Sequence, residues 1–129
     1  KMIYNFAKQQ KRLVASAMSV LKENGTLVYS TCTLTPEENE GVVQFMLDNF
    51  NVKVEKCILP IKTRQGIGEW QGRQFNNEIK SCCRIYPQDN DSEGFFVAKI
   101  KLLEKVLPRK SSDFRGIGNQ EISFIKNGK

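Results

Sequence analysis

The stretch that decides the fold is residues 26–40, TLVYSTCTLTPEENE. An apolar run through residues 27–29 ends abruptly in Ser-Thr-Cys-Thr, and a run without polar alternation is typical of a strand covered on both faces. Residues 35–38, Thr-Pro-Glu-Glu, form a capping box with Pro at the first helical position, which predicts that a helix starts there. Strand, short turn and helix together predict that Cys32 is presented at the mouth of a crevice.

The residues before this stretch predict a helix that packs against the strand. Apolar side chains recur at helical spacing across residues 2–23, and Asn24-Gly25 supplies a left-handed C-terminal cap. A helix, a glycine turn and a buried strand make up half of a right-handed βαβ unit. We therefore expect the strand that precedes the helix to lie upstream of Lys1.

The residues after it predict an antiparallel edge and a tail. Residues 52–59 form a strand ending at a proline, and residues 60–80 form a long surface loop. Residues 83–87 form a short strand, and residues 94–102 form a strand whose apolar side chains alternate in direction. The strands at 52–59 and 94–102 are expected to pair antiparallel. Residues 1–103 then make one unit, followed by a basic tail over 104–129.

The composition indicates a single basic domain. The 129 residues carry a formal net charge of +6 with a pI near 9.2, which favours a polyanionic partner but also fits a merely soluble basic protein. The absence of histidine excludes His-based triads, His general bases and His zinc ligands within the chain. No apolar run reaches the length of a membrane span, so we expect a cytoplasmic protein without membrane contact.

The four cysteines are interpreted as reduced thiols with different roles. No Cys-x-x-Cys occurs, so the sequence predicts neither a zinc ribbon nor a thioredoxin-type motif, and no metal. Cys57, Cys82 and Cys83 lie among apolar residues and are interpreted as small buried hydrophobes. Cys32 differs, because ligands of parallel α/β sheets bind beyond the carboxyl ends of strands and a helix N-terminus favours a thiolate. By position alone, a nucleophile and an ordinary cysteine both remain open.

The sequence around Cys32 favours the nucleophile over the ordinary cysteine. Residues 28–33 (VYSTCT) followed by 36–40 (PEENE) closely resemble the motif of the Sun/Nop family of RNA cytosine-C5 methyltransferases. The resemblance runs from Ile3 to Leu102, and its later segments are most similar to the archaeal tRNA-modifying branch. Further segments match in order: Gln10, Gly25, residues 69–72, residues 84–87 and residues 93–99.

The resemblance implies a fold and a reaction. The fold is α/β, the C-terminal half of a Rossmann-like class I methyltransferase sheet with flanking helices. The reaction is transfer of a methyl group from S-adenosylmethionine to C5 of cytosine in RNA, with tRNA favoured and rRNA next. Because C5 is a weak nucleophile, a Cys32 thiolate adds to C6 and activates it, and the target base must be unpaired or flipped out.

The resemblance also implies which residues surround Cys32. Glu38 and Asn39 are expected to fix the helix cap behind the thiol, a structural role. Trp70, in the 60–80 loop, either stacks on a base or packs the loop down. Gln88 stands where relatives often have His, so no imidazole contact is expected there. The residues implied to contact substrate are Thr31, Thr33, Arg84, Gly94 and Phe95, although the last three also fit a plain hairpin.

The sequence lacks other parts of such an enzyme. Neither Gly66-Ile67-Gly68 nor Gly116-Ile117-Gly118 completes a nucleotide-binding loop. The Asp-Ala-Pro-Cys segment of the family is also absent. We therefore expect the upstream half of the domain to be a partner that holds most of the S-adenosylmethionine site, and the isolated chain to be inactive. The alternative is a non-catalytic, basic RNA-binding or assembly module that keeps the fold.

Overall fold

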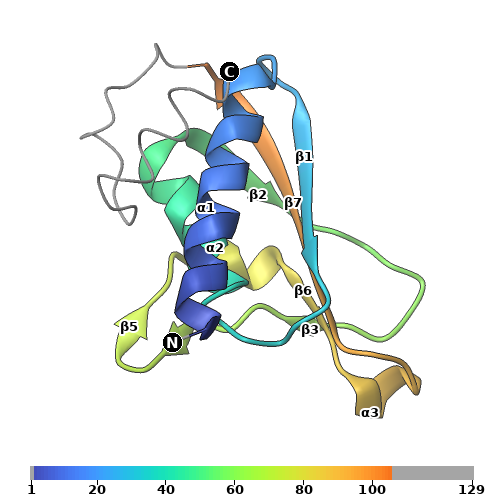
Figure 1. The fold of residues 1–129 in the computed structure, drawn as a ribbon. Helices are drawn as coiled ribbons and strands as arrows, with labels where there is room; N and C mark the ends of the chain where they lie inside the picture. Colours follow the sequence, from blue (N-terminus) through green and yellow to red (C-terminus); the bar gives the residue numbers. More distant parts are fainter. Residues whose placement is uncertain (1, 106–129) are drawn as a thin grey trace.

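A computed structural model describes residues 2–105 (Figure 1). The predicted tail therefore lies almost entirely outside the described residues, and its division from residues 1–103 stays a prediction. The elements, in chain order, are α1 (Met2–Val20), β1 (Thr26–Thr31), α2 (Glu40–Asn49), β2 (Asn51–Glu55), β3 (Arg64–Gln65), β4 (Glu69–Trp70), β5 (Arg73–Gln74), the 3-10 helix η1 (Asn77–Ser81), β6 (Cys83–Ile85), α3 (Pro87–Asn90) and β7 (Phe95–Glu104).

Strand β7 is the centre of the sheet. β1 pairs along one side of it, while β2 and β6 share the other side, and β3 pairs with β6. All of these pairings are antiparallel, with Tyr29 opposite Ala98 and Val54 opposite Ile100. The antiparallel pairing of the 52–59 region with the 94–102 strand, predicted from sequence, is confirmed.

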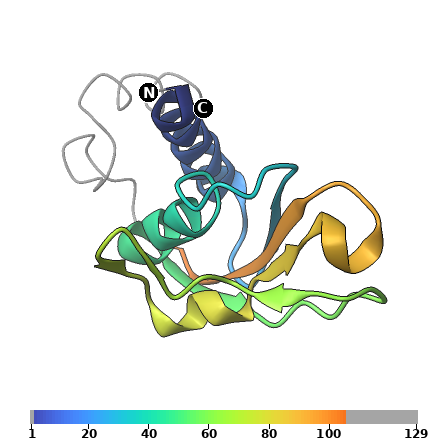
Figure 2. The same ribbon diagram turned by 90° about the horizontal axis from the view of Figure 1, so that it is seen from below.

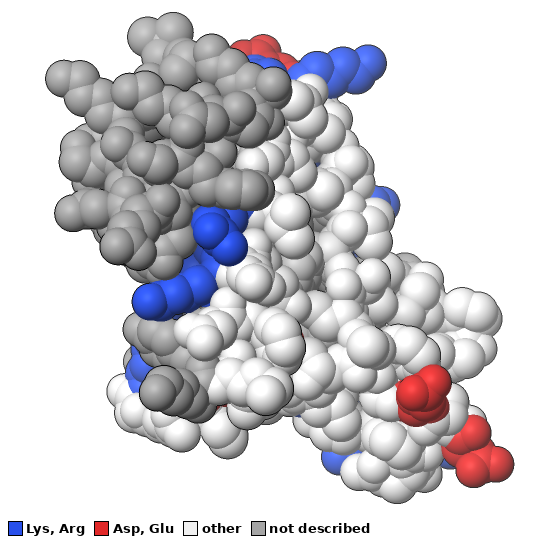
Figure 3. Space-filling view, viewed as in Figure 1, with Lys and Arg blue, Asp and Glu red and all other residues white. Residues whose placement is uncertain are grey.

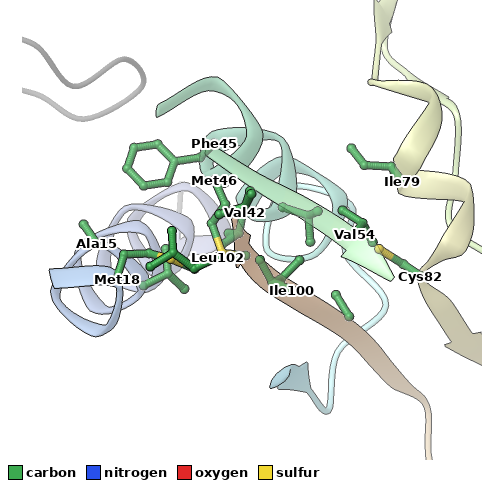
Figure 4. Close-up of a cluster of buried hydrophobic side chains, with 14 of the residues drawn as sticks. Ala15, Met18, Val42, Phe45, Met46, Val54, Ile79, Cys82, Ile100 and Leu102 are labelled. Atoms are coloured by element: carbon green, nitrogen blue, oxygen red, sulfur yellow. The ribbon is translucent and has the colours of Figure 1, made fainter. Parts of the chain in front are cut away.

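The two longer helices cover one face of this sheet. Figures 1 and 2 show α1 and α2 side by side on that face. Every second side chain of β7 points into the interface, and Phe96, Ala98 and Ile100 are fully buried, as the alternation predicted. Figure 4 shows Met18 of α1 and Met46 of α2 meeting Ile100 in one cluster. Burial of these apolar side chains is the main stabilising term of the fold.

Strand β1 differs from its prediction. It was expected to be covered on both faces, but its residues alternate between exposed and half-buried, and Val28 is 60% exposed. The reason is that α1 and α2 cover only one face of the sheet, so every second side chain of β1 points outward. β1 is also an edge strand, since β7 pairs on one side of it and no described strand pairs on the other. An edge strand leaves a row of backbone N–H and C=O groups unpaired. Exposed apolar side chains of α1, Leu13 and Val20, add to this uncovered surface.

The turn between α1 and β1 has the cap that the sequence predicted. α1 ends at Val20, and Asn24 adopts the left-handed conformation with φ of 63°. A Cβ on Gly25 would lie 2.8 Å from the Lys22 carbonyl oxygen, so the chain needs glycine there. Asn24 N–H donates to the Leu102 carbonyl at 2.7 Å. The turn is therefore tied to β7.

The start of α2 differs from the prediction. The helix begins at Glu40, and residues 36–39 form turns. The predicted capping box does not form: Glu38 N–H donates to the Thr35 carbonyl, and Thr35 N–H donates to Thr33 Oγ1. The two side chains instead bond each other, with Thr35 Oγ1 donating to Glu38 Oε2 at 3.1 Å. Asn39, however, has φ of −112° and ψ of −91°, and its side chain makes no cap. It is directed toward the residues around Cys32, so the helix N-terminus lies further from the thiol than predicted.

The 60–80 region is more ordered than a plain loop. It contains β3, the β4–β5 hairpin and the start of η1, whose Ile79 is fully buried. None of the described helices combines the length and apolar character that a membrane span requires. The cytoplasmic location stays a prediction.

Candidate active site

Cys32 lies on a turn directly after β1. Its side chain is exposed and is a free thiol. The preceding residue, Thr31, is the last residue of β1 and pairs with Phe96 of β7. The segment from Thr33 to Asn39 then leads into α2. A rigid strand therefore delivers the thiol to the surface at the sheet end.

A buried amide holds both neighbours of Cys32. Thr31 Oγ1 donates to Asn39 Oδ1 at 2.5 Å, and Asn39 Nδ2 donates to the Thr33 carbonyl at 2.9 Å. Asn39 is fully buried. An asparagine fits this position because one side chain offers both an acceptor and a donor. The amide thus fixes the backbone on each side of the thiol.

Glu38 ties the same turn to α1 and β1. Its carboxylate accepts from Thr35 and, at 3.3 Å, from Gln10 Nε2 of α1, while its carbonyl accepts from Tyr29 Oη at 2.6 Å. Burial and the charge of Glu38 raise the pKa of Tyr29, which keeps the phenol protonated as a donor. Thr33 Oγ1 and Thr35 Oγ1 share a hydrogen bond of 2.5 Å. Glu38 and Asn39 therefore both hold the turn around Cys32 by hydrogen bonds, which is a structural role.

A buried ion pair supports the turn from the other side. Arg84 Nε donates to Glu40 Oε2 at 2.6 Å and its Nη2 to Glu40 Oε1 at 2.9 Å, and both side chains are almost fully buried. Arg84 Nη2 also donates to the Leu34 carbonyl at 2.8 Å, and Ile67 N–H donates to Glu40. Burial disfavours the guanidinium charge, but the hydrogen bond and charge of Glu40 outweigh it and raise the pKa of Arg84. The pair joins β6, α2 and the Cys32 turn.

The start of β7 approaches the same turn. A Cβ on Gly94 would lie 2.9 Å from Leu34 Cγ, so glycine allows this close approach. Phe95 follows and is 38% exposed. The structure thus brings Thr31, Thr33 and Gly94 to the segment around Cys32. The guanidinium of Arg84 is directed to Glu40 and Leu34 inside the protein.

Sequence reasoning did not identify Glu40 as part of the site. A signal was present, because a carboxylate at a position followed by the apolar residues of α2 requires a buried partner. Its partner, Arg84, is 44 residues further along the chain. Nothing in a single sequence indicates which cation closes such a pair.

A pocket lies at Glu37 and Gly41, where the segment after Cys32 leads into α2. It has a volume of about 240 Å³ and is formed by α1, the residues before α2 and the β4–β5 hairpin. Figure 2 shows the hairpin beside α2. The lining residues are Ala7, Lys8, Lys11, Glu37, Gly41, Trp70, Gln71, Arg73 and Phe75.

Neither this pocket nor the Gly66-Ile67-Gly68 segment fits S-adenosylmethionine. The sulfonium of that molecule is a cation, and the pocket is lined by Lys8, Lys11 and Arg73. The Gly66-Ile67-Gly68 segment is closed, since a Cβ on Gly66 would lie 2.2 Å from the Ile79 carbonyl oxygen. Among residues 2–105 no three His, Cys, Asp or Glu side chains are grouped so as to hold a metal ion.

The α/β fold places an exposed thiol on a braced turn at the end of a strand, an arrangement that suits a cysteine acting on a bound ligand. The chain belongs to the family described as 16S rRNA methyltransferase RsmB/F, whose model matches residues 1–101. The family membership predicted from the motif is confirmed.

Named relatives agree with this assignment. The tRNA (cytosine(49)-C(5))-methyltransferase of Pyrococcus abyssi is 48% identical over 99 residues, which cover 77% of this chain and 32% of the relative. The 28S rRNA (cytosine(4447)-C(5))-methyltransferase of Homo sapiens is 34% identical, over 98% of this chain and 15% of the relative. The chain therefore spans about a third or less of the length of these two relatives.

Solved structures share the fold. A methyltransferase homolog protein from Pyrococcus horikoshii has a TM-score of 0.73 and 40% identity, over 78% of this chain and 32% of that one. NSun6 from the same organism has a TM-score of 0.59 and 34% identity, over 76% of this chain and 22% of that one. It was solved with SFG, an analogue of S-adenosylmethionine. The Rossmann-like fold class predicted from sequence is confirmed.

Proposed function

We propose that this chain is part of an S-adenosylmethionine-dependent RNA cytosine-C5 methyltransferase in which Cys32 is the nucleophile, acting on tRNA in the first place and rRNA in the second. The observation that carries the proposal is the exposed Cys32 thiol, held between Thr31 and Thr33 by the buried Asn39 amide. A nucleophile gains rate when its position is fixed before substrate arrives.

The chemistry follows from what a thiolate does to cytosine. The Cys32 sulfur forms a bond to C6, and the electron pair of the C5–C6 double bond becomes available at C5. C5 then accepts the methyl group that S-adenosylmethionine supplies. Loss of the C5 proton and cleavage of the S–C6 bond restore the double bond and release the thiolate. In this scheme Cys32 reacts, the residues around it position the thiol and the base, and the upstream half holds most of the cofactor site.

The neighbouring residues divide into two roles. Phe95 is exposed at the start of β7, so it supplies an apolar contact for a flipped base. The hydroxyls of Thr31 and Thr33 are hydrogen-bonded within the turn. These two residues therefore contact the base through their backbone atoms, one on each side of Cys32. Arg84 and Gly94 act on substrate through Leu34, which both contact.

The partner of this chain is the upstream half of the methyltransferase domain. The free edge of β1 and exposed Val28, Leu13 and Val20 form a surface suited to a further strand and its covering elements. That half brings the cofactor site and the acid that contacts the base. The proposal explains why a strand with an unbroken apolar run is uncovered in this chain.

The test is to supply the upstream half and measure methyl transfer to cytosine in tRNA. Replacing Cys32 with Ala is expected to lower the rate at least about a thousandfold, because the covalent route to an activated C5 is lost. The matched control is Cys57→Ala, which alters a half-buried cysteine outside the turn and should keep the rate within about twofold. Product formed at an equal rate by both variants would contradict the proposal. Salt-sensitive RNA binding without any methylated product would favour the non-catalytic module.

A further inference from the structure

The pocket beside α1 combines positive charge with an aromatic ring. Lys8 and Lys11 come from α1, and Arg73 comes from the β4–β5 hairpin. Figure 3 shows Lys and Arg side chains gathered over the α1 side of the molecule. Trp70 from the hairpin is 38% exposed. The pocket therefore offers cations for a phosphate and a ring face for a base.

The cations of the pocket lie close enough to repel one another. Burial, then the charges of Arg73 and Lys8, lower the pKa of Lys11, while Asp48 acts in the opposite direction. Asp48 compensates Arg73 only weakly, with 3.9 Å between Arg73 Nη2 and the carboxylate. The Arg73 guanidinium also lies over Phe75, 5.5 Å from the ring centre. An anion bound among these groups would relieve the repulsion.

Glu37 adds an acceptor to the pocket. Its Oε2 accepts from the indole N–H of Trp70 at 3.1 Å, which fixes the orientation of the ring. Its Oε1 is buried and has no hydrogen-bond partner among the described residues. A buried acceptor without a donor is costly. A ribonucleotide brings donors, the 2′-hydroxyl and the exocyclic amino groups.

We propose that this pocket binds a nucleotide of single-stranded RNA next to the target cytosine, with the base stacked on Trp70 and the phosphate held by Lys8, Lys11 and Arg73. This inference rests on the proposed function for its RNA substrate. The segment that carries Cys32 also carries Glu37, so the pocket and the thiol share one support. One strand can then pass over the segment with a flipped cytosine on one side and a flanking nucleotide on the other.

Trp70 makes the proposal directly measurable, because it is the chain's single tryptophan. A single-stranded RNA of about twelve nucleotides, titrated into the 129-residue chain, is expected to quench the indole fluorescence as a base stacks on the ring. The double substitution Lys8→Gln with Arg73→Gln should weaken binding about tenfold and reduce the salt slope by about 1.4, since each lost phosphate contact contributes about 0.7 for a single strand.

The matched control removes the same charge elsewhere. Lys53→Gln with Lys56→Gln changes exposed residues of and just after β2, and binding should stay within about threefold of the unsubstituted chain. Trp70→Leu has no indole to quench, so its binding is measured by the fluorescence anisotropy of a dye-labelled RNA of the same length. The substitution should weaken binding about tenfold through lost stacking and leave the salt slope unchanged, since no phosphate contact is removed. Circular dichroism confirms that each variant keeps its fold. Equal weakening in the two double variants, or no quenching at low salt, overturns the proposal.

The two proposals fail separately. Cys32→Ala should leave the quenching and its salt dependence unchanged, because the thiol lies outside the pocket lining. Quenching that is absent while Cys32-dependent methyl transfer persists overturns the pocket alone. Quenching that is present in a reconstituted protein without methyl transfer supports the pocket and contradicts the catalytic role.

Discussion

At the scale of single residues, Asn39 matters most for the thiol. Its amide contacts Thr31 on one side of Cys32 and Thr33 on the other, and it is fully buried. The sequence motif predicted a structural role for it, but as part of a helix cap. The side chain bonds the Thr31 hydroxyl and the Thr33 carbonyl in place of the N–H groups at the start of α2. That competition cannot be judged from helix propensity alone.

Replacing Asn39 with Ala is expected to lower the free energy of unfolding by about 1–3 kcal/mol, because Thr31 and Thr33 lose a buried partner. It should also slow methyl transfer at least about tenfold, since the thiol loses its fixed position. Chemical denaturation and single-turnover kinetics with the upstream half supplied measure the two effects.

The control for this prediction is Asn49→Ala. Asn49 is equally buried and donates to the Phe45 carbonyl, at the far end of α2 from Cys32. It should lose comparable stability and keep its rate. Equal rate losses in the two variants would show that Asn39 acts through stability alone.

At the scale of secondary-structure elements, a buried ion pair joins α2 to β6 and supports the turn that carries Cys32. Glu40 opens α2 and Arg84 lies in the middle of β6, and their ion pair also contacts the Leu34 carbonyl. The elements themselves were predictable: alternation identified β7, and the Asn24-Gly25 cap identified the end of α1. Their pairing across 44 residues was not, because local patterns carry no information on distant partners.

Arg84→Lys is expected to lower the free energy of unfolding by about 3 kcal/mol. Lysine keeps the charge but cannot reproduce the guanidinium fork, so the buried Glu40 carboxylate loses hydrogen bonds. Because the contact to Leu34 is also lost, kcat should fall by more than KM rises. Denaturation and steady-state kinetics at matched temperature measure this.

Arg64→Lys provides the comparison. Arg64 makes a similar two-bond pair with Asp89, but its side chain is 53% exposed. Exposed pairs contribute less than about 1 kcal/mol, so stability and kinetics should change little. A larger loss at Arg64 than at Arg84 would contradict the positioning role of the buried pair.

At the scale of the whole molecule, the chain presents two unlike surfaces. β1 has a free edge and an exposed Val28, where we propose that the upstream half binds, while the pocket at α1 is lined by three cations and is proposed to bind RNA. The motif around Cys32 indicated the chemistry from sequence. The exposed face of β1 was not predicted, because an apolar run indicates that a strand is covered but does not show which part of a protein covers it.

The whole fold should lose stability at alkaline pH. Burial raises the pKa of the Cys82 thiol above its ordinary value of 9.0, and burial likewise raises that of the Tyr29 phenol above 10.0. The unfolded chain therefore releases these protons at lower pH than the folded chain. Stability is fully present below about pH 9 and falls as the pH rises further.

Urea titrations between pH 7 and pH 11 measure this loss, and Cys82→Ala should remove the part of it that begins near pH 9. The cavity left in that variant lowers the free energy of unfolding equally at every pH. The decisive quantity is therefore how steeply this free energy falls with pH, not its absolute value. An unchanged slope would show that Cys82 does not titrate on unfolding.

The central claim, that Cys32 attacks cytosine, is tested most directly by trapping the adduct. With the upstream half and S-adenosylmethionine supplied, RNA carrying 5-fluorocytosine cannot lose a proton from C5, so the covalent complex should persist. Protease digestion and mass spectrometry are expected to locate the nucleotide on the peptide that contains Cys32, and Cys32→Ala should yield no adduct. An adduct on another cysteine, or one that persists in Cys32→Ala, would contradict the account.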